Sequence, residues 1–163
     1  MVSKTFGFAP SLMCMDLFDL QAQLAFFEDK VSYLHVDIMD GHFVKNLTLS
    51  PWFISQIRPR TKVKIDAHLM VTHPQDLLTE LINIDVDCIS PHIETLLNHA
   101  FSFAFQVKDA GKELGIVISP ETDISALFPI LHYLDKITVM TIDPGFAGAR
   151  FIPHMPGFEH KPN

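Results

Sequence analysis

The sequence predicts an α/β fold built around a parallel sheet, and three observations support that class. Short runs of apolar and β-branched residues alternate with stretches whose apolar residues recur at helical spacing. The short runs recur about every 22 to 30 residues, the spacing of strand–helix units that feed a parallel sheet. Polar residues gather at the C-terminal ends of several runs, where (β/α) barrels carry their active sites.

Six segments are expected to form strands, and five segments between them to form helices. The strands are expected at 6–13, 33–39, 63–70, 87–93, 115–119 and 136–142. The helices are expected at 17–29, 51–57, 74–84, 98–110 and 124–131. Two of these helices open with proline, which suits a first helical position because its fixed φ is already helical.

An open doubly wound sheet and a closed (β/α)8 TIM barrel are both compatible with this order. No G-x-G-x-x-G follows the first strand, which weakens the dinucleotide-binding version of the open sheet. The barrel accounts better for polar strand ends. Since a barrel takes about 250 residues, we interpret residues 1–163 as one partial barrel with about the first six strands, followed by an atypical tail at roughly 152–163 that does not close it.

Composition excludes several classes of partner. Twelve Lys and Arg against nineteen Asp and Glu give a net charge of −7, which disfavours nucleic acid and acidic membrane surfaces. No apolar run approaches the length of a spanning helix, and the first residues lack the continuous apolar core of a signal peptide. Cys14 and Cys88 form no C-x-x-C pair, and we expect buried free thiols in a cytoplasmic protein.

Two neighbouring strands carry residues suited to a metal ion. Residues two apart share a face of a strand, so His35 and Asp37 point the same way, and His68 lies near the end of the following strand. Two imidazoles and a carboxylate suit Zn²⁺, Fe²⁺, Mn²⁺ or Co²⁺ better than Mg²⁺. A structural His–Asp hydrogen bond is the alternative interpretation of the same residues.

Methionines and glycines mark two further features of the strand ends. Met13, Met39, Met70 and Met140 lie at or near the ends of four strands, where they are either core filler or an apolar collar that excludes water. Gly145 and Gly148 bracket a turn after the sixth strand whose backbone N–H groups could hold an anion.

Several motifs together closely resemble the ribulose-phosphate 3-epimerase family. They are APSLMCMDL, HVDIMDGHFVKNLTLSP, DAHLMVTHP and KITVMTIDPGFAG, and the resemblance runs from about Phe8 to Ile152. SLMCMDL, LTLSP and MTIDPGFAG look most like the D-allulose-6-phosphate 3-epimerase branch. The resemblance implies a barrel that inverts C3 of a ketose phosphate through a 2,3-enediolate, with a divalent metal as Lewis acid.

The resemblance also implies roles for individual residues. His35, Asp37 and His68 match the metal ligands, and Asp37 also matches one of two acid/base residues. Ser11 and His68 match substrate contacts. The loop that closes over the substrate and the methionine collar match Gly145, Phe146, Ala147, Gly148, Met39, Met70 and Met140.

The family pattern includes parts that this sequence does not contain. The resemblance places a fourth ligand and the second acid/base Asp on a seventh strand, and phosphate-binding glycines after the seventh and eighth. Three hypotheses therefore stand: an epimerase of D-allulose 6-phosphate and D-fructose 6-phosphate, a D-ribulose-5-phosphate 3-epimerase, and a non-catalytic truncated remnant. We expect a phosphorylated ketose as substrate and a homo-oligomer when the barrel is complete.

Overall fold

The computed structural model describes residues 6–153, which form a five-stranded parallel sheet with helices between the strands. The sheet order β1-β2-β3-β4-β5 follows the chain, so each strand lies beside its successor. The strands are β1 (Tyr33–Met39), β2 (Lys64–Met70), β3 (Cys88–Pro91), β4 (Glu113–Ile118) and β5 (Lys136–Val139). This arrangement confirms the α/β class and is consistent with part of a TIM barrel.

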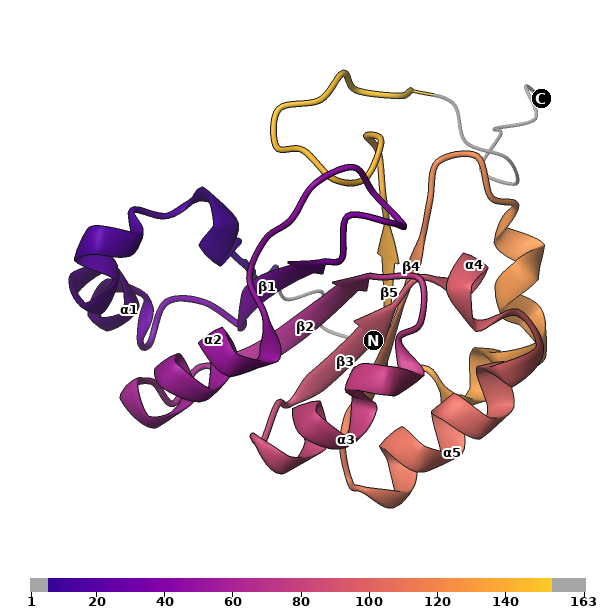
Figure 1. Ribbon diagram of the computed structural model, residues 1–163, viewed down its shortest axis with the longest axis horizontal. Helices are drawn as coiled ribbons and strands as arrows, with labels where there is room; N and C mark the ends of the chain where they lie inside the picture. The colour runs from indigo at the N-terminus through magenta and orange to yellow at the C-terminus, as the bar shows by residue number, and fades with distance from the viewer. Residues whose placement is uncertain (1–5, 154–163) are drawn as a thin grey trace.

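Helices connect the strands, and Figure 1 shows α2, α3 and α5 along one side of the sheet. The α-helices are α1 (Leu20–Phe27), α2 (Pro51–Ile57), α3 (Gln75–Asn83), α4 (Ile93–Leu96) and α5 (Ala100–Asp109). Tighter 3₁₀ segments are η1 (Leu12–Cys14), η2 (Leu17–Asp19), η3 (Arg58–Arg60), η4 (Leu97–His99) and η5 (Ile124–Tyr133). None of the helices in the described part of the chain is both long enough and apolar enough to cross a membrane.

Strand alternation separates an apolar face from a polar one. The side chains that pack under the helices are almost wholly buried and belong to one cluster, which includes Leu34, Val36, Ile65, Ala67, Ile89 and Ile116. The intervening residues, His35, Asp37 and His68 among them, point to the other face. A one-residue shift of register would exchange the two faces, so burial of the apolar set fixes where the polar set lies.

The first predicted strand, at 6–13, is wrong in detail. Its backbone runs beside β1, where the N–H of Ser32 donates to the Phe8 carbonyl and that of His35 donates to the Pro10 carbonyl, both at 2.9 Å. Only one bridge forms, between Ser11 and His35, before the chain turns into η1. Pro10 has no N–H to continue a ladder, which explains why a strand does not develop.

The helix predictions hold with local corrections. Helix α2 begins at Pro51 as expected, and the Ser50 hydroxyl caps it by accepting from the Phe53 N–H. The expected helix at 124–131 is 3₁₀ with Pro129 inside it, and the end of the strand expected at 87–93 turns into α4.

The prediction of two buried thiols is correct for Cys88 and wrong for Cys14, which is exposed. Most of the tail expected at 152–163 lies outside the described residues.

Asp40 holds the loop that follows β1 against the end of β2. Its Oδ1 accepts from the backbone N–H groups of His42 and Phe43, at 2.8 and 2.9 Å, and its Oδ2 accepts from the Thr72 N–H at 2.8 Å. Burial alone would raise the pKa of Asp40, but these hydrogen bonds outweigh it and lower the pKa to about 2. The fold therefore favours the ionised carboxylate.

We predict that Asp40→Asn destabilises the chain by about 1 kcal/mol at neutral pH, because an amide N–H₂ would face a backbone donor. The wild-type contribution is present above the ordinary pKa of 3.8 and is lost as the pH falls towards 2, whereas the variant lacks this dependence. Urea unfolding followed by circular dichroism at neutral and acidic pH measures both effects. The exposed Asp29→Asn is the control, and equal unfolding curves for both variants would contradict the assignment.

Candidate metal centre and active site

A cavity of about 220 Å³ lies at the carboxyl ends of the strands, on the face of the sheet opposite the helices. The first two strands contribute His35, Asp37 and His68 to its lining, and the turn before η1 contributes Ser11. The loop after β5 forms the other wall. Three parts of the chain that are distant in sequence therefore meet at one cavity.

The structure brings the three predicted ligands together. The Nε2 atom of His35 lies 3.2 Å from Nδ1 of His68, and Oδ1 of Asp37 lies 3.3 Å from the first and 3.1 Å from the second. The cause is the register of β1 and β2, which pairs Asp37 with His68 and places His35 two residues away on the same face. A one-residue shift between these two strands would turn the apolar residues of one strand away from the core.

The donor set fits a divalent metal ion. Nitrogen and oxygen ligands about 2.0–2.1 Å from one ion in tetrahedral geometry stand about 3.3 Å apart, close to the 3.1–3.3 Å separations of these three atoms. The mixture of two imidazoles and one carboxylate is typical of first-row transition metals and zinc. His35, Asp37 and His68 could therefore hold such an ion.

Two carboxylates determine the charge of His35. Its Nδ1 lies 2.8 Å from Oδ2 of Asp66, and its Nε2 faces Asp37. Burial lowers the pKa of His35, but hydrogen bonds to Asp37 and Asp66 outweigh burial and raise the pKa to about 9. Without a metal, the imidazole thus carries a proton on the nitrogen that faces the cluster at neutral pH.

Side chains from three strands contact the Asp66 carboxylate. It is fully buried opposite His35 in the register of β1 and β2, and accepts from the Ser90 hydroxyl at 2.6 Å and from the Lys136 ammonium. Burial acts to raise the pKa of Asp66, but its bonds to His35 and Lys136 lower it well below its usual range. Asp66 therefore remains ionised and orients the His35 ring.

His68 has the opposite character. Its side chain is 3% exposed, and burial lowers the pKa to about 4, with only partial compensation by the neighbouring Asp37 carboxylate. A neutral imidazole is the form that binds metals. The second ring nitrogen, Nε2, lies 2.9 Å from Nε2 of the buried His92.

Asp37 presents different partners to its two carboxylate oxygens. Oδ1 faces the histidines, whereas Oδ2 accepts from the Ser11 hydroxyl. Burial would raise the pKa of Asp37, but its contacts with His35 and His68 hold the pKa well below its usual range. The Thr48 hydroxyl donates to the Asp37 backbone carbonyl at 2.5 Å, which ties the residue to the following loop.

Apolar side chains surround the cluster. Met13, Met39, Met70 and Met140 all line the cavity, and Met39 and Met70 pack with Val44 in a small buried cluster of their own. Met39 and Met70 are thus core residues that also line the cavity. The thioether side chains make the mouth of the cavity apolar, so it offers few groups that bind water.

The loops after β1 and β5 meet above the strand ends (Figure 1). The Asn46 amide donates to the Gly145 carbonyl at 2.7 Å, and a Cβ on Gly145 would lie 3.0 Å from that of Val44. Gly145 also has a φ of +113°, so this close approach requires glycine. Gly145, Phe146 and Ala147 line the cavity, whereas Gly148 lies outside its lining.

Several residues around the cluster were not predicted as site residues. Asp66, Ser90 and Lys136 support His35, and His92 with Glu94 lies behind His68. The pairing of D-A-H with H-V-D in parallel register could have indicated Asp66. The partners from β3, α4 and β5 depend on how distant parts of the sheet come together, which no local pattern specifies.

A polar cluster at the carboxyl ends of parallel strands is how enzymes of the (β/α)-barrel class build active sites, and we assign the chain to that class. Residues 7–157 match the ribulose-phosphate 3 epimerase family, and the chain belongs to that family of carbohydrate-phosphate epimerases. Because epimerases are isomerases, the family assignment makes this chain an isomerase.

Individual relatives agree with this assignment. Ribulose-phosphate 3-epimerase of Treponema pallidum is 35% identical over 94% of this chain and 70% of its own length, and that of Synechocystis sp. is 35% identical over 94% and 68%. The enzyme of Aquifex aeolicus is 36% identical over 88% and 65%. The chain thus spans about two thirds of the length of these relatives.

We predict that binding of Zn²⁺ or Co²⁺ to the metal-free chain releases about one proton at neutral pH, because the ion displaces the proton from His35. Affinity should therefore rise about tenfold per pH unit from about pH 6 to about pH 8, below the pKa of His35. Isothermal titration calorimetry in buffers of different ionisation enthalpy measures the proton count. His132→Gln, an exposed histidine, is the control, and an affinity that does not change with pH would refute the competition.

Proposed function

We propose that the chain catalyses metal-dependent 3-epimerisation of a ketose phosphate. The observation that carries the proposal is the convergence of three ligand atoms, within 4.8 Å of one another, in a cavity lined by methionines. The family assignment supports the same chemistry. The metal would be Zn²⁺, Mn²⁺, Co²⁺ or Fe²⁺, held by His35, Asp37 and His68.

The reaction requires removal of a proton from carbon. The proton on C3 is acidic because C3 is adjacent to the C2 carbonyl, and its loss leaves a 2,3-enediolate. A bound divalent cation would supply Lewis-acid stabilisation of the negative charge on the substrate oxygens. The protein must supply a base, orientation of the substrate and exclusion of water.

Asp37 is the proposed base on one face of the substrate. With Oδ1 turned to the histidines, Oδ2 is the oxygen that could accept the C3 proton, and Ser11 is placed to exchange its bond to Oδ2 for a substrate hydroxyl. The C–H electron pair becomes the C2–C3 double bond. Return of a proton to C3 from the opposite face inverts the centre.

Inversion also needs an acid on that opposite face. The family resemblance assigns this role to an aspartate on a seventh strand, which the present sequence does not include. Proton abstraction and inversion are successive steps, and each can be measured by itself. Exchange of the C3 proton with solvent measures the first, and formation of the epimer measures the second.

The cavity walls would protect the enediolate. Met39, Met70 and Met140 form the proposed collar that excludes water from the carbanion-like intermediate. The loop of Gly145, Phe146, Ala147 and Gly148 would close over the substrate, held at its base by Asn46. A phosphorylated ketose is the proposed substrate. We also propose that the protein forms a homo-oligomer when the barrel is complete.

Two ketose phosphates are candidates for the substrate of this chain. The motifs SLMCMDL, LTLSP and MTIDPGFAG favour D-allulose 6-phosphate. The relatives from Treponema and Synechocystis are named ribulose-phosphate 3-epimerases, which favours D-ribulose 5-phosphate. We propose D-allulose 6-phosphate, and a higher kcat/KM for D-ribulose 5-phosphate would reverse that choice without affecting the reaction class.

We predict that the metal-loaded chain exchanges the C3 proton of D-allulose 6-phosphate with D₂O, and that Asp37→Asn slows this exchange by about 10²–10⁴-fold. Proton NMR of the sugar measures exchange and epimer formation in the same sample. Asp29→Asn is the exposed control. A folded chain that binds metal but shows exchange no faster than Asp37→Asn would support the non-catalytic remnant instead.

A further inference from the structure

His92 lies behind the metal cluster, and the proposed chemistry gives it no role. It follows β3, makes a bridge to Val117 on β4 and is fully buried. Its ring stacks on that of His68, with centroids 5.1 Å apart and planes 23° apart. A buried imidazole in contact with a ligand imidazole can influence which nitrogen of the ligand carries a proton.

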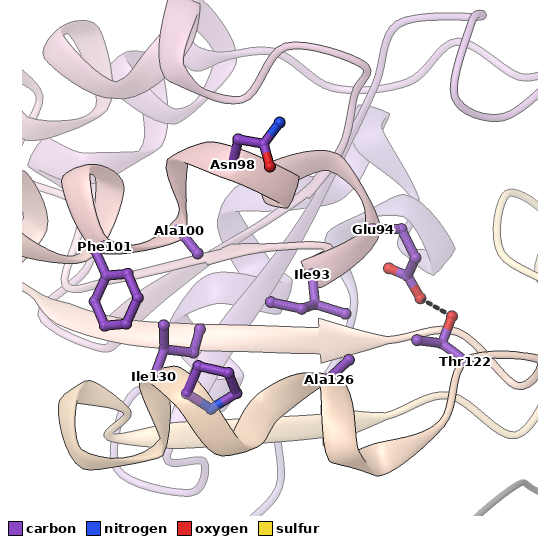
Figure 2. A pocket seen from close by; sticks show the side chains of 9 residues that line it. Ile93, Glu94, Asn98, Ala100, Phe101, Thr122, Ala126 and Ile130 are labelled. Atoms are coloured by element: carbon purple, nitrogen blue, oxygen red, sulfur yellow. Dashed lines mark hydrogen bonds between the residues drawn. The ribbon is translucent and has the colours of Figure 1, made fainter.

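Hydrogen bonds hold the Glu94 carboxylate in place beside the His92 ring. Its Oε1 accepts from the Ser119 backbone N–H at 2.9 Å and from the Thr122 hydroxyl at 2.5 Å, as Figure 2 shows for Thr122. Its Oε2 lies 3.2 Å from Nδ1 of His92. Burial acts to raise the pKa of Glu94, but bonds from His92, Thr122 and Ser119 outweigh it and lower the pKa to about 2.

The proton positions follow from what each group can donate. An ionised carboxylate only accepts, so Nδ1 of His92 must carry the hydrogen that lies between it and Glu94. The Ser119 hydroxyl, 3.1 Å from the same Nδ1, can accept as well. In the neutral imidazole the remaining nitrogen, Nε2, then has a free lone pair.

The same logic carries over to His68. Its Nε2 lies 2.9 Å from the accepting Nε2 of His92, so His68 donates from Nε2. The Asp37 carboxylate, 3.1 Å from Nδ1 of His68, accepts its hydrogen from Nε2 of His35 instead. Neutral His68 is then left with its lone pair on Nδ1, the atom that faces His35 and Asp37. The nitrogen that points into the cluster is thus the one able to bind a cation.

We propose that Glu94 and His92 form a two-residue relay that fixes the tautomer of His68 and directs its Nδ1 lone pair to the metal. Both are positioning residues that act through His68, and the inference rests on the proposed metal site. His35 is oriented differently, by direct contact of Asp66 with its Nδ1. The two histidine ligands therefore depend on two separate carboxylates.

Glu94→Gln tests the relay with almost no change of shape. The amide oxygen must replace Oε1, which faces the Ser119 N–H and Thr122, so the amide N–H₂ must face Nδ1 of His92. His92 would then accept on Nδ1 and donate from Nε2. His68 would accept on Nε2 and carry its hydrogen on Nδ1, where it blocks the metal.

Thr122→Val is the matched control. It removes a hydrogen bond to the same carboxylate but leaves the carboxylate opposite His92. A purely structural role for Glu94 would make both variants lose thermal stability without changing the tautomer. The relay predicts that only Glu94→Gln changes it.

The experiment is ¹⁵N NMR of the imidazoles in the metal-free chain, combined with calorimetric titration of Zn²⁺ or Co²⁺ into folded variants. We expect His68 to carry its hydrogen on Nε2 in the wild type and on Nδ1 in Glu94→Gln, with the metal dissociation constant raised about 10–100-fold only in that variant. An unchanged tautomer or an unchanged dissociation constant in Glu94→Gln would overturn the relay. If wild type bound no metal, the proposed function would fail, while the NMR result would still decide the tautomer assignment.

Discussion

A buried carboxylate that faces two imidazole nitrogens needs a cation, and this constraint connects the rest of the structure. Oδ1 of Asp37 and Nδ1 of His68 are both acceptors within 3.1 Å of each other. In the metal-free chain the proton on His35 supplies the positive charge. A divalent ion could supply it more fully, since it can bind all three atoms at once. Binding of a metal would thus replace one positive charge at the cluster, the proton on His35, by another.

Surrounding elements hold this cluster through polar contacts from most of the sheet. β2 supplies Asp66, β3 supplies Ser90 and β5 supplies Lys136, and all three converge behind His35. His92 and Glu94 lie behind His68. Buried polar groups of this kind are costly unless each is satisfied, and among the described residues no buried side-chain nitrogen or oxygen lacks a partner. The ligand geometry therefore depends on the whole sheet and not on two strands alone.

Much of this could be predicted because the relevant signals are local or periodic. Alternation in HVD and in DAH places His35, Asp37 and His68 on one face, and the βα spacing puts their strands side by side. The segment before η1 was misjudged because one proline in an extended run prevents a ladder. Lys136 and Glu94 could not be assigned from sequence, because their partners are set by sheet curvature and by a turn between β3 and α4. Residues that tune the site are therefore harder to predict than residues that form it.

The central claim is that His35, Asp37 and His68 form one metal site. Crystals of the chain grown with Zn²⁺ or Co²⁺, and measured on both sides of the metal absorption edge, test it most directly. We predict an anomalous peak bonded to Nε2 of His35, Oδ1 of Asp37 and Nδ1 of His68, with Nε2 of His68 still beside His92. A peak that appears elsewhere, or a cluster that keeps its proton and excludes the metal at saturating concentration, would contradict it.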